Sequence, residues 1–365
     1  MIEVEIRQDN TWLVVDPIVG CIHDCQYCFL TTHNKTRQKG SVIMTPEQTV
    51  QKLLGYWAFK PSSVIMIGSE TDIFMNKINR DFLVEFIKRY VDSGIRNILC
   101  FSTKCFIPDE FISFIQSYDD LKTIFYISYS GLPKEIEPLI NKEKVKSNFL
   151  RLNEAKQKII HFWRPMIPQN SNLETLITVM EDVKGADCSI MRGLNLNKDL
   201  QKSTWYWPEV QMAEIDFTRV VSVWPKNLHQ NLSLLMKNYP NHPVFFKNSC
   251  AISYVFGLPE FSGIFNTTRC LNSYCPSTQR EICNNYSNNK KNLLIELVRL
   301  ELDKIGANND FVLIENNKSV FVKGHMNHEQ IACITQVLGC KVEVEFVESE
   351  HEWGGYVLGH IDYAI

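Results

Sequence analysis

The sequence predicts an α/β protein: a partial (β/α)6 barrel, followed by a cysteine-bearing extension and a small C-terminal α+β domain. Between residues 11 and 193, six short apolar runs recur about every 30 residues, and most are followed by an amphipathic helical segment. The runs are continuously apolar rather than alternating, which is typical of parallel strands buried on both faces. Parallel strands with crossover helices form a barrel, which we favour, or a flat doubly wound sheet.

The first strand is expected in "TWLVVDP" (11–17) and the first helix in "TPEQTVQKLLGYW" (45–57). Thr45 is a residue type preferred at an N-cap, and Pro46 is preferred at the first helical position. Gly94 is expected to end the second helix, because glycine readily adopts the left-handed conformation that follows many helices. The other strands are expected at 62–68, 97–102, 122–130, 158–167 and 187–193, and the other helices at 80–94, 108–118, 142–157 and 172–185.

Past residue 200 the β/α rhythm stops. We place the barrel at 1–200, the cysteine-bearing extension at 201–288 and the α+β domain at 289–365. The Asn-rich stretch 284–292 has the composition of a linker or turn. The last domain is expected to hold a helix at 292–306, a hairpin at 311–324 whose turn is 315–318, a helix at 327–339, and strands at 341–347 and 355–364.

Charge and cysteine usage limit the functional classes. The chain has twelve cysteines in 365 residues and a formal net charge of −3, which argues against tight non-specific binding to a nucleic-acid backbone. Residues 1–10 do not resemble a signal peptide, and no apolar run reaches the roughly 18 residues of a membrane-spanning helix. We therefore expect a cytoplasmic protein with no membrane partner, in which cysteines serve metal ligation rather than disulfides.

Three cysteines, Cys21, Cys25 and Cys28, fall within eight residues just after the first predicted strand. They could be small core residues, or three ligands of a Cys3His zinc site completed by His23 or a remote histidine. An iron–sulfur cluster explains them better. Cubane clusters usually take four thiolates, so three leave one iron open. An open iron at the carboxyl end of a barrel strand lies where barrel enzymes carry out their chemistry.

The stretch "CIHDCQYC" (21–28) has the C-x3-C-x-aromatic-C spacing of the radical S-adenosylmethionine (SAM) superfamily. With its flanks, "DPIVGCIHDCQYCF" (16–29) most resembles the spore photoproduct lyase-like branch. The resemblance implies a [4Fe-4S] cluster whose open iron binds the amino and carboxylate groups of SAM. One-electron reduction would cleave SAM to methionine and a 5′-deoxyadenosyl radical, which abstracts hydrogen from a substrate. The aromatic residue of the motif, Tyr27, is implied to lie against the adenine.

Further matches follow across residues 12–195. Gly68, Ser69 and Glu70 stand where the family commonly has Gly-Gly-Glu, which holds the SAM amino group, so the middle glycine is absent here. Thr71 and Asp72 match the branch's T-D-P-Y-Q without its proline, and "FSTK" (101–104) resembles its T-K segment.

Two more candidates, Ser128 and Arg164, lie at strand ends where the family usually contacts the ribose and the carboxylate of SAM. Solvated polar residues at a strand end are the alternative for this pair. Cys105, just past a strand end in "STKCF", could face the active site as a hydrogen-atom donor. Four other cysteines fall in strand or helix patterns and are expected in the core: Cys100, Cys188, Cys333 and Cys340.

A second group of cysteines lies in the extension: Cys250, Cys270, Cys275 and Cys283. Four thiols in 34 residues would satisfy a second cubane cluster or one zinc ion. We expect an auxiliary [4Fe-4S] cluster, because many radical SAM enzymes carry one beyond the barrel. Zinc, and reactive or buried thiols that bind no metal, remain alternatives.

The leading hypothesis is a radical SAM enzyme with a nucleotide-like or small-metabolite substrate and an electron donor such as flavodoxin or ferredoxin. The branch resemblance favours the nucleotide-like substrate. An alternative is a maturase of a ribosomally made peptide, with 289–365 adding a peptide strand to a sheet edge as a leader-binding module. A hypothesis of another class is a zinc-stabilised binding protein, which explains neither the Gly-led cysteine loop nor the six β/α units.

Overall fold

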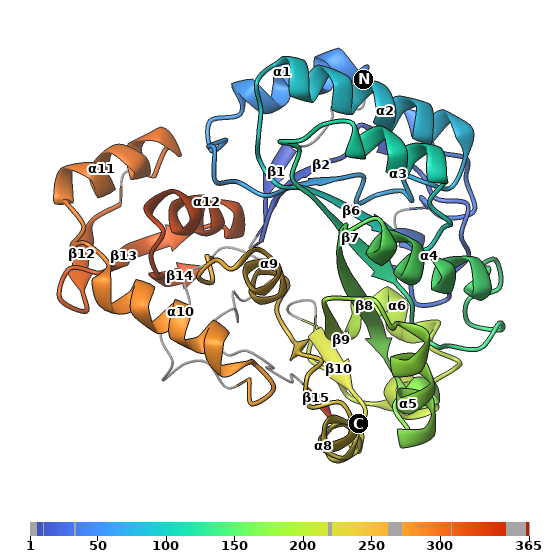
Figure 1. Cartoon of the computed structure of the whole chain (residues 1–365). Helices are drawn as coiled ribbons and strands as arrows, with labels where there is room; N and C mark the ends of the chain where they lie inside the picture. Colours follow the sequence, from blue (N-terminus) through green and yellow to red (C-terminus); the bar gives the residue numbers. More distant parts are fainter. Residues whose placement is uncertain are drawn as a thin grey trace.

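The computed structural model describes residues 6–9, 11–32, 34–217, 221–261, 272–307, 309–347 and 363–364. In these ranges the chain forms a ten-stranded, a three-stranded and a two-stranded sheet. Figure 1 shows the large sheet through the centre, with the blue to green helices along one side of it. Most of the orange and red elements form a separate group beside it.

Six parallel strands form the central sheet, as the sequence predicts. Each pairs in parallel with the next, in sequence order and without a reversal. A doubly wound sheet requires a reversal of strand order, so that alternative is wrong and the order is that of a partial barrel. The strands are β2 (Leu13–Val15), β5 (Ile65–Ile67), β6 (Leu99–Thr103), β7 (Thr123–Ser128), β8 (Lys158–Met166) and β9 (Cys188–Leu196).

Other strands extend the sheet at both edges. At one edge β1 (Ile6–Gln8) pairs antiparallel with β2. At the other, β10 (Val221–Trp224) pairs antiparallel with the carboxyl end of β9, and β11 (Val244–Phe245) pairs in parallel with its amino end. The short β15 (Tyr363–Ala364) lies parallel to β10. The extension therefore contributes strands directly to the barrel sheet.

The predicted barrel helices are confirmed, and local capping explains their start. Thr45 caps the first helix by accepting from the Gln48 backbone N–H, and the Gln48 side chain bonds back to complete a capping box. The second helix begins at Lys77, earlier than expected, because Asn76 caps it. The helices are α1 (Pro46–Gly55), α2 (Lys77–Asp92), α3 (Asp109–Gln116), α4 (Lys142–Glu154) and α5 (Leu173–Asp182).

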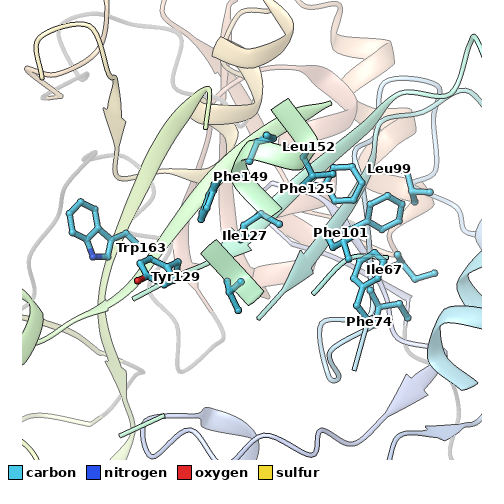
Figure 2. Packing of buried hydrophobic residues seen from close by; sticks show 14 of the residues in the cluster. Ile67, Phe74, Leu99, Phe101, Phe125, Ile127, Tyr129, Phe149, Leu152 and Trp163 are labelled. Carbon is cyan, nitrogen blue, oxygen red and sulfur yellow. The ribbon is translucent and has the colours of Figure 1, made fainter. Parts of the chain in front are cut away.

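Both faces of the sheet are apolar, and each packs against different helices. Alternate residues such as Leu99, Phe101 and Phe125 point to the outer face, where α1–α5 cover them (Figure 2). The residues between them, such as Cys100 and Tyr126, point to the inner face. There they pack against α9 (Asn248–Phe256), a helix of the extension. The interior of the partial barrel is therefore filled at this level by a later segment of the chain.

The extension is more regular than its composition suggests. Besides α9 it contains α6 (Lys198–Lys202), α7 (Pro208–Met212), α8 (Leu228–Asn238) and α10 (Ser277–Asn289). The prediction of a linker or turn at 284–292 is wrong for residues 284–289, which form the end of α10. Tertiary contacts outweigh the weak helix propensity of asparagine here. Lys318 Nζ donates to the Asn288 carbonyl at 3.1 Å, and Lys290 Nζ donates to the Gly339 carbonyl at 2.6 Å.

The C-terminal α+β elements match the prediction. They are α11 (Ile295–Lys304), β12 (Phe311–Ile314), β13 (Ser319–Met326), α12 (His328–Leu338) and β14 (Val342–Val347), with sheet order β12-β13-β14. The hairpin turn has Glu315, Asn316 and Asn317 at positive φ. Of the strand expected at 355–364, residues 355–362 lie outside the described residues. Residues 363–364 form β15, which pairs with β10 of the large sheet, so the prediction that they belong to the small domain is wrong. Among the described residues, no helix has the length and apolar character needed to cross a lipid bilayer.

Candidate metal and cofactor site

The three clustered cysteines lie on a loop, residues 20–40, that leaves the sheet beyond the carboxyl end of β2. Two short strands, β3 (Ile18–Val19) and β4 (Ser41–Val42), pair antiparallel and close its base. Gly20 has φ +105°, and a Cβ there would lie 3.1 Å from the Lys39 carbonyl oxygen, so glycine is required. Thr71 Oγ1 donates to the Gly20 carbonyl at 2.6 Å, which fastens the loop to the segment after β5. We call residues 20–40 the cysteine loop.

The thiols of the cysteine loop are mostly buried. Cys21 is 9% and Cys25 5% exposed, and burial raises the pKa of both thiols to about 12. Burial also raises the pKa of Cys28. Thiols whose pKa is raised in this way stay neutral at pH 7 unless a cation accompanies them. The donor set therefore suits a metal or cluster that would hold them as thiolates.

Their spacing bears on which metal fits. Tetrahedral zinc with Zn–S bonds of 2.3 Å needs its thiolates about 3.8 Å apart. In the part of the chain that the structure describes, only His23, Asp72 and Cys105 bring three ligand atoms within 4.8 Å of one another. At least one pair among the sulfurs of Cys21, Cys25 and Cys28 therefore lies more than 4.8 Å apart. A cubane cluster accepts wider spacing because each thiolate binds a different iron.

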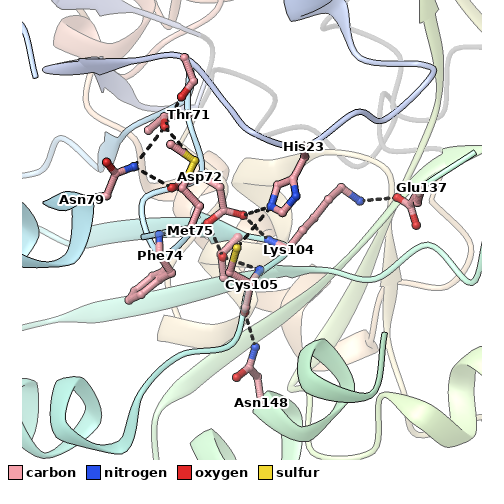
Figure 3. Close-up of polar contacts among 12 residues, drawn as sticks. His23, Thr71, Asp72, Phe74, Met75, Asn79, Lys104, Cys105, Glu137 and Asn148 are labelled. Carbon is pink, nitrogen blue, oxygen red and sulfur yellow. Dashed lines mark hydrogen bonds and ion pairs between the residues drawn. The ribbon is translucent and has the colours of Figure 1, made fainter. Parts of the chain in front are cut away.

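Asp72 is the hub beneath this loop (Figure 3). Its Oδ1 accepts from Thr103 Oγ1 at 2.7 Å and from the Phe74 N–H at 3.1 Å, and its Oδ2 accepts from the Lys104 N–H at 2.7 Å. His23 Nε2 lies 3.6 Å from Oδ2. Burial alone would raise the pKa of Asp72, but these donors outweigh it and hold the pKa below its usual value. The Asp72 carboxylate therefore links the segment after β5 to the end of β6, and it lies beside His23 of the cysteine loop.

Cys105 lies beside the same group. His23 Nε2 is 3.3 Å from Cys105 Sγ, so the thiol and Asp72 approach the same ring nitrogen. A Cys-His-Asp triad needs the thiol and the carboxylate on opposite nitrogens, so this geometry is not that of a nucleophilic triad. Cys105 packs against the outer, helix-covered core. His23 Nδ1 is buried and has no hydrogen-bond partner among the described residues.

Asp16, which the sequence analysis did not single out, supports the predicted Gly-Ser-Glu segment. It follows β2 and is 2% exposed. Its carboxylate accepts from the Ser69 N–H, from Ser69 Oγ at 2.7 Å and from the Glu70 N–H at 3.1 Å. Glu70 in turn pairs with Lys35 of the cysteine loop at 2.7 Å. The segment 68–70 is therefore held from both sides.

Glu137 is the second residue missed from the sequence. It is 2% exposed, and its Oε1 accepts from Tyr27 Oη and, at 2.7 Å, from Lys104 Nζ. Its Oε2 accepts from Ser130 Oγ at 2.6 Å. Burial alone would raise the pKa of Glu137, but Lys104 and the hydroxyls lower it below its usual value. Tyr27, expected against the adenine of SAM, is thus anchored at its hydroxyl.

Ser128 and Arg164 share the inner face of the sheet. Alternation along β7 places Ser128 on the side of Ile124 and Tyr126, and alternation along β8 places Arg164 on the side of Phe162. Ser128 Oγ is buried and has no hydrogen-bond partner among the described residues. Arg164 is exposed, with its guanidinium 4.2 Å from the centre of the Phe162 ring. Both side chains therefore lie on the inner face of the sheet, at the carboxyl-terminal parts of their strands.

The second cysteine group is only partly described, because Cys270 lies outside the described residues. Cys250, on α9, and Cys275 pack against the same inner apolar cluster. Cys283, on α10, accepts from the Glu260 N–H and from Gln279 Nε2, both at 3.4 Å. The Glu260 carboxylate accepts from Ser249 Oγ, next to Cys250. Glu260 therefore links the start of α9 to the middle of α10.

No family model matches the chain, and no curated protein matches it. Solved structures do match. One is spore photoproduct lyase complexed with dinucleoside spore photoproduct, at 14% identity and a TM-score of 0.52, covering 68% of this chain and 80% of that one. A variant of the same lyase with bound AdoMet and dinucleoside spore photoproduct matches at 14% identity and a TM-score of 0.51, over 67% and 79%. The chain therefore shares the partial-barrel fold of spore photoproduct lyase.

Proposed function

We propose that this protein is a radical SAM enzyme in which Cys21, Cys25 and Cys28 hold a [4Fe-4S] cluster with one open iron. The observation that carries the proposal is the cysteine loop itself. It places two buried thiols and a third, half-buried one beyond the carboxyl end of the first parallel strand, in a fold shared with spore photoproduct lyase. When bound, such a cluster would supply the electron that cleaves SAM to methionine and a 5′-deoxyadenosyl radical.

The residues around the loop would bind and orient the cofactor. Asp16 holds the backbone of 68–70, where the family resemblance places the SAM amino group. Arg164 offers a guanidinium for the SAM carboxylate, and Ser128 offers a buried hydroxyl for the ribose. Asp72 fixes the strand ends beneath the loop, so that these groups keep their positions.

A second [4Fe-4S] cluster on Cys250, Cys270, Cys275 and Cys283 is part of the proposal. N–H donors to the sulfur of Cys283 support it, because such bonds stabilise thiolate ligands and tune cluster potentials. The described sulfurs of Cys250, Cys275 and Cys283 do not come within 4.8 Å of one another as a group, which favours a cluster over one zinc ion.

For the substrate we propose a nucleotide-like molecule or small metabolite. The structural neighbour binds a dinucleoside spore photoproduct, and the net charge of −3 does not suit tight, non-specific duplex binding. A flavodoxin- or ferredoxin-like protein would donate the electron. A specific feature supports the second candidate, a peptide maturase: β12 is an edge strand of the three-stranded sheet, available for pairing with an added strand.

Metal content and SAM cleavage test the proposal together. Iron and acid-labile sulfide would be measured after anaerobic reconstitution of wild type, of a C21A/C25A/C28A variant and of C340A, a core-cysteine control. With dithionite and SAM, 5′-deoxyadenosine would be followed by chromatography. We expect about eight irons in wild type and C340A, and about four in the triple variant with cleavage abolished.

The other outcomes separate the alternatives. About four irons in wild type and none in the triple variant would reassign the second cysteine group to zinc or to thiols that bind no metal. Stoichiometric zinc without iron or 5′-deoxyadenosine would overturn the enzyme hypothesis. For the substrate, nucleosides and nucleotides would be screened by isothermal calorimetry against peptides of 20–30 residues. Saturable binding of a peptide, lost when 289–365 is deleted, would favour the maturase.

A further inference from the structure

Glu137 has surroundings that the proposed function does not by itself require. It comes from the loop after β7, far in sequence from the cysteine loop, and is buried at 2% exposure. Both of its oxygens are occupied, by Tyr27 and Lys104 on one side and Ser130 on the other. Burying a carboxylate raises the free energy of the folded state unless it is paired. We therefore ask what its charge does that a neutral side chain would not.

The partners of Glu137 connect it to the cysteines. Tyr27 lies between Cys25 and Cys28 in the chain, and the N–H of its neighbour Gln26 donates to the Ile136 carbonyl at 3.0 Å. Backbone and side-chain bonds therefore join the same two segments. Lys104 Nζ pairs with Glu137 at 2.7 Å (Figure 3). The same Nζ lies 5.6 Å from the centre of the Tyr27 ring. One negative and one positive charge thus flank the aromatic residue of the cysteine motif.

These two charges must act on any redox group that the loop holds. A cluster that accepts an electron becomes more negative, so a nearby carboxylate disfavours reduction and a nearby ammonium favours it. Inside the protein, where water screens weakly, a unit charge about 10 Å away changes an equilibrium about tenfold at an effective dielectric of 20. Removing one member of the pair would leave the other uncompensated.

We propose that Glu137 is a positioning residue that, paired with Lys104, fixes Tyr27 against the cysteine loop and sets the reduction potential of the cluster held there. The proposal rests on the proposed function for the presence of that cluster. Its consequence is directional. Glu137→Gln should make the cluster easier to reduce, and Lys104→Met should make it harder to reduce. The double variant should return close to wild type, because the two charges cancel.

The test is a potentiometric titration of the reconstituted full-length protein without SAM, with the reduced cluster followed by EPR. At a fixed potential we expect the ratio of reduced to oxidised cluster to rise about tenfold in E137Q and to fall about tenfold in K104M. The control keeps both charges of the pair. E135Q changes an exposed acid two residues away. It should stay within about threefold of wild type.

Each outcome decides something. Shifts in the same direction for E137Q and K104M, or none in either, would overturn the proposal, because a merely structural role predicts no opposite signs. Iron content and the midpoint of thermal unfolding identify a variant that has not folded. If E137Q does not load a cluster, K104M carries the test through its predicted fall. A wild-type protein without any reducible cluster would instead contradict the proposed function.

Discussion

The cysteine loop lies among buried charges, whereas Cys250 and Cys275 of the second group lie against apolar side chains. Asp16, Asp72 and Glu137 surround the first site, each 5% exposed or less, and each carries at least three hydrogen bonds. Cys250 and Cys275 instead pack with residues such as Ile252 and Phe245 on the inner face of the barrel. Near the second group, the buried carboxylate that the structure describes is Glu260, which accepts from Ser249 and lies 3.4 Å from Lys247 Nζ.

The contrast shows two ways of placing thiols. Buried charges hold the cysteine loop by directional bonds, and the same bonds impose a field on whatever the loop binds. Apolar packing holds α9 by contact area, which is insensitive to charge and pH. A site whose ligand changes charge benefits from the first arrangement. A cluster that only needs to be kept in place is served by the second.

The largest expected effect comes from removing the hub of the charged site. Asp72→Ala leaves the Thr103 hydroxyl and the Phe74 and Lys104 N–H groups without their acceptor. We expect a loss of about 3–5 kcal/mol in unfolding free energy, the usual cost of breaking a buried charged network. Urea denaturation at pH 7 would measure it, and reconstituted iron content should fall in parallel.

The matched control for Asp72 is Asp81→Ala on α2. Asp81 is an exposed acid paired with Lys77 four residues away, and its loss should change stability by less than about 0.5 kcal/mol. The pKa of Asp72 is lowered in the folded state, so its contribution is present above its ordinary pKa of 3.8 and is lost as pH falls through the folded value. A D72A effect below about 1 kcal/mol at pH 7 would contradict the hub assignment.

The apolar arrangement makes a contrasting prediction. Ile252→Ala on α9 removes a fully buried side chain from the inner cluster and should cost about 2–4 kcal/mol through lost burial and a cavity. Urea denaturation at pH 7 and pH 5.5 should give the same loss, because no charge is involved. Leu258→Ala, at an exposed position just beyond α9, should cost little. A strongly pH-dependent loss for I252A would show that charge also holds the second region.

Much of this fold could be predicted because hydrophobic periodicity reports burial directly. The six continuous apolar runs became β2, β5, β6, β7, β8 and β9, and the Thr45–Pro46 signal placed the start of α1. The Asn-rich end of α10 could not be predicted in the same way. Its end is held by Lys318 of the C-terminal domain, which donates to the Asn288 carbonyl, and by Lys290, which donates to the Gly339 carbonyl. Composition carries no trace of such distant partners.

The residues of the candidate site also differ in whether a local sequence signal predicts them. The cysteine loop could be predicted from the sequence because the spacing of its cysteines lies within one short segment. Asp16 also carried a local signal, since it directly follows a strand in "VVDP". Glu137 carried none: it lies 110 residues from Tyr27 in the chain, and only the fold brings them together. Whether the predicted cofactor contacts of Glu70, Ser128 and Arg164 form stays a prediction, because it depends on a bound ligand.

The smallest effect is expected where barrel and extension meet. His161 on β8 and His242 before β11 both contact Ser189 Oγ, at 2.9 Å and 2.8 Å. Burial lowers the pKa of His161 to about 3 and that of His242 to about 4. Both histidines are neutral at pH 7, so their titration does not lower the stability of the folded state at that pH. Below about pH 6.5 the unfolded chain binds protons that the folded chain cannot, and stability falls as pH approaches the folded values.

Between pH 7 and pH 5 this difference amounts to about 2 kcal/mol per histidine. His242→Asn should therefore remove about 2 kcal/mol of the pH dependence, whatever it does to stability at pH 7. Urea denaturation of wild type and variant across this range gives the comparison. His229→Asn, at an exposed position on α8, should leave the slope unchanged. If the slope of unfolding free energy against pH were unchanged in H242N, His242 would be protonated in the folded protein. The contact between barrel and extension would then contain a positive charge.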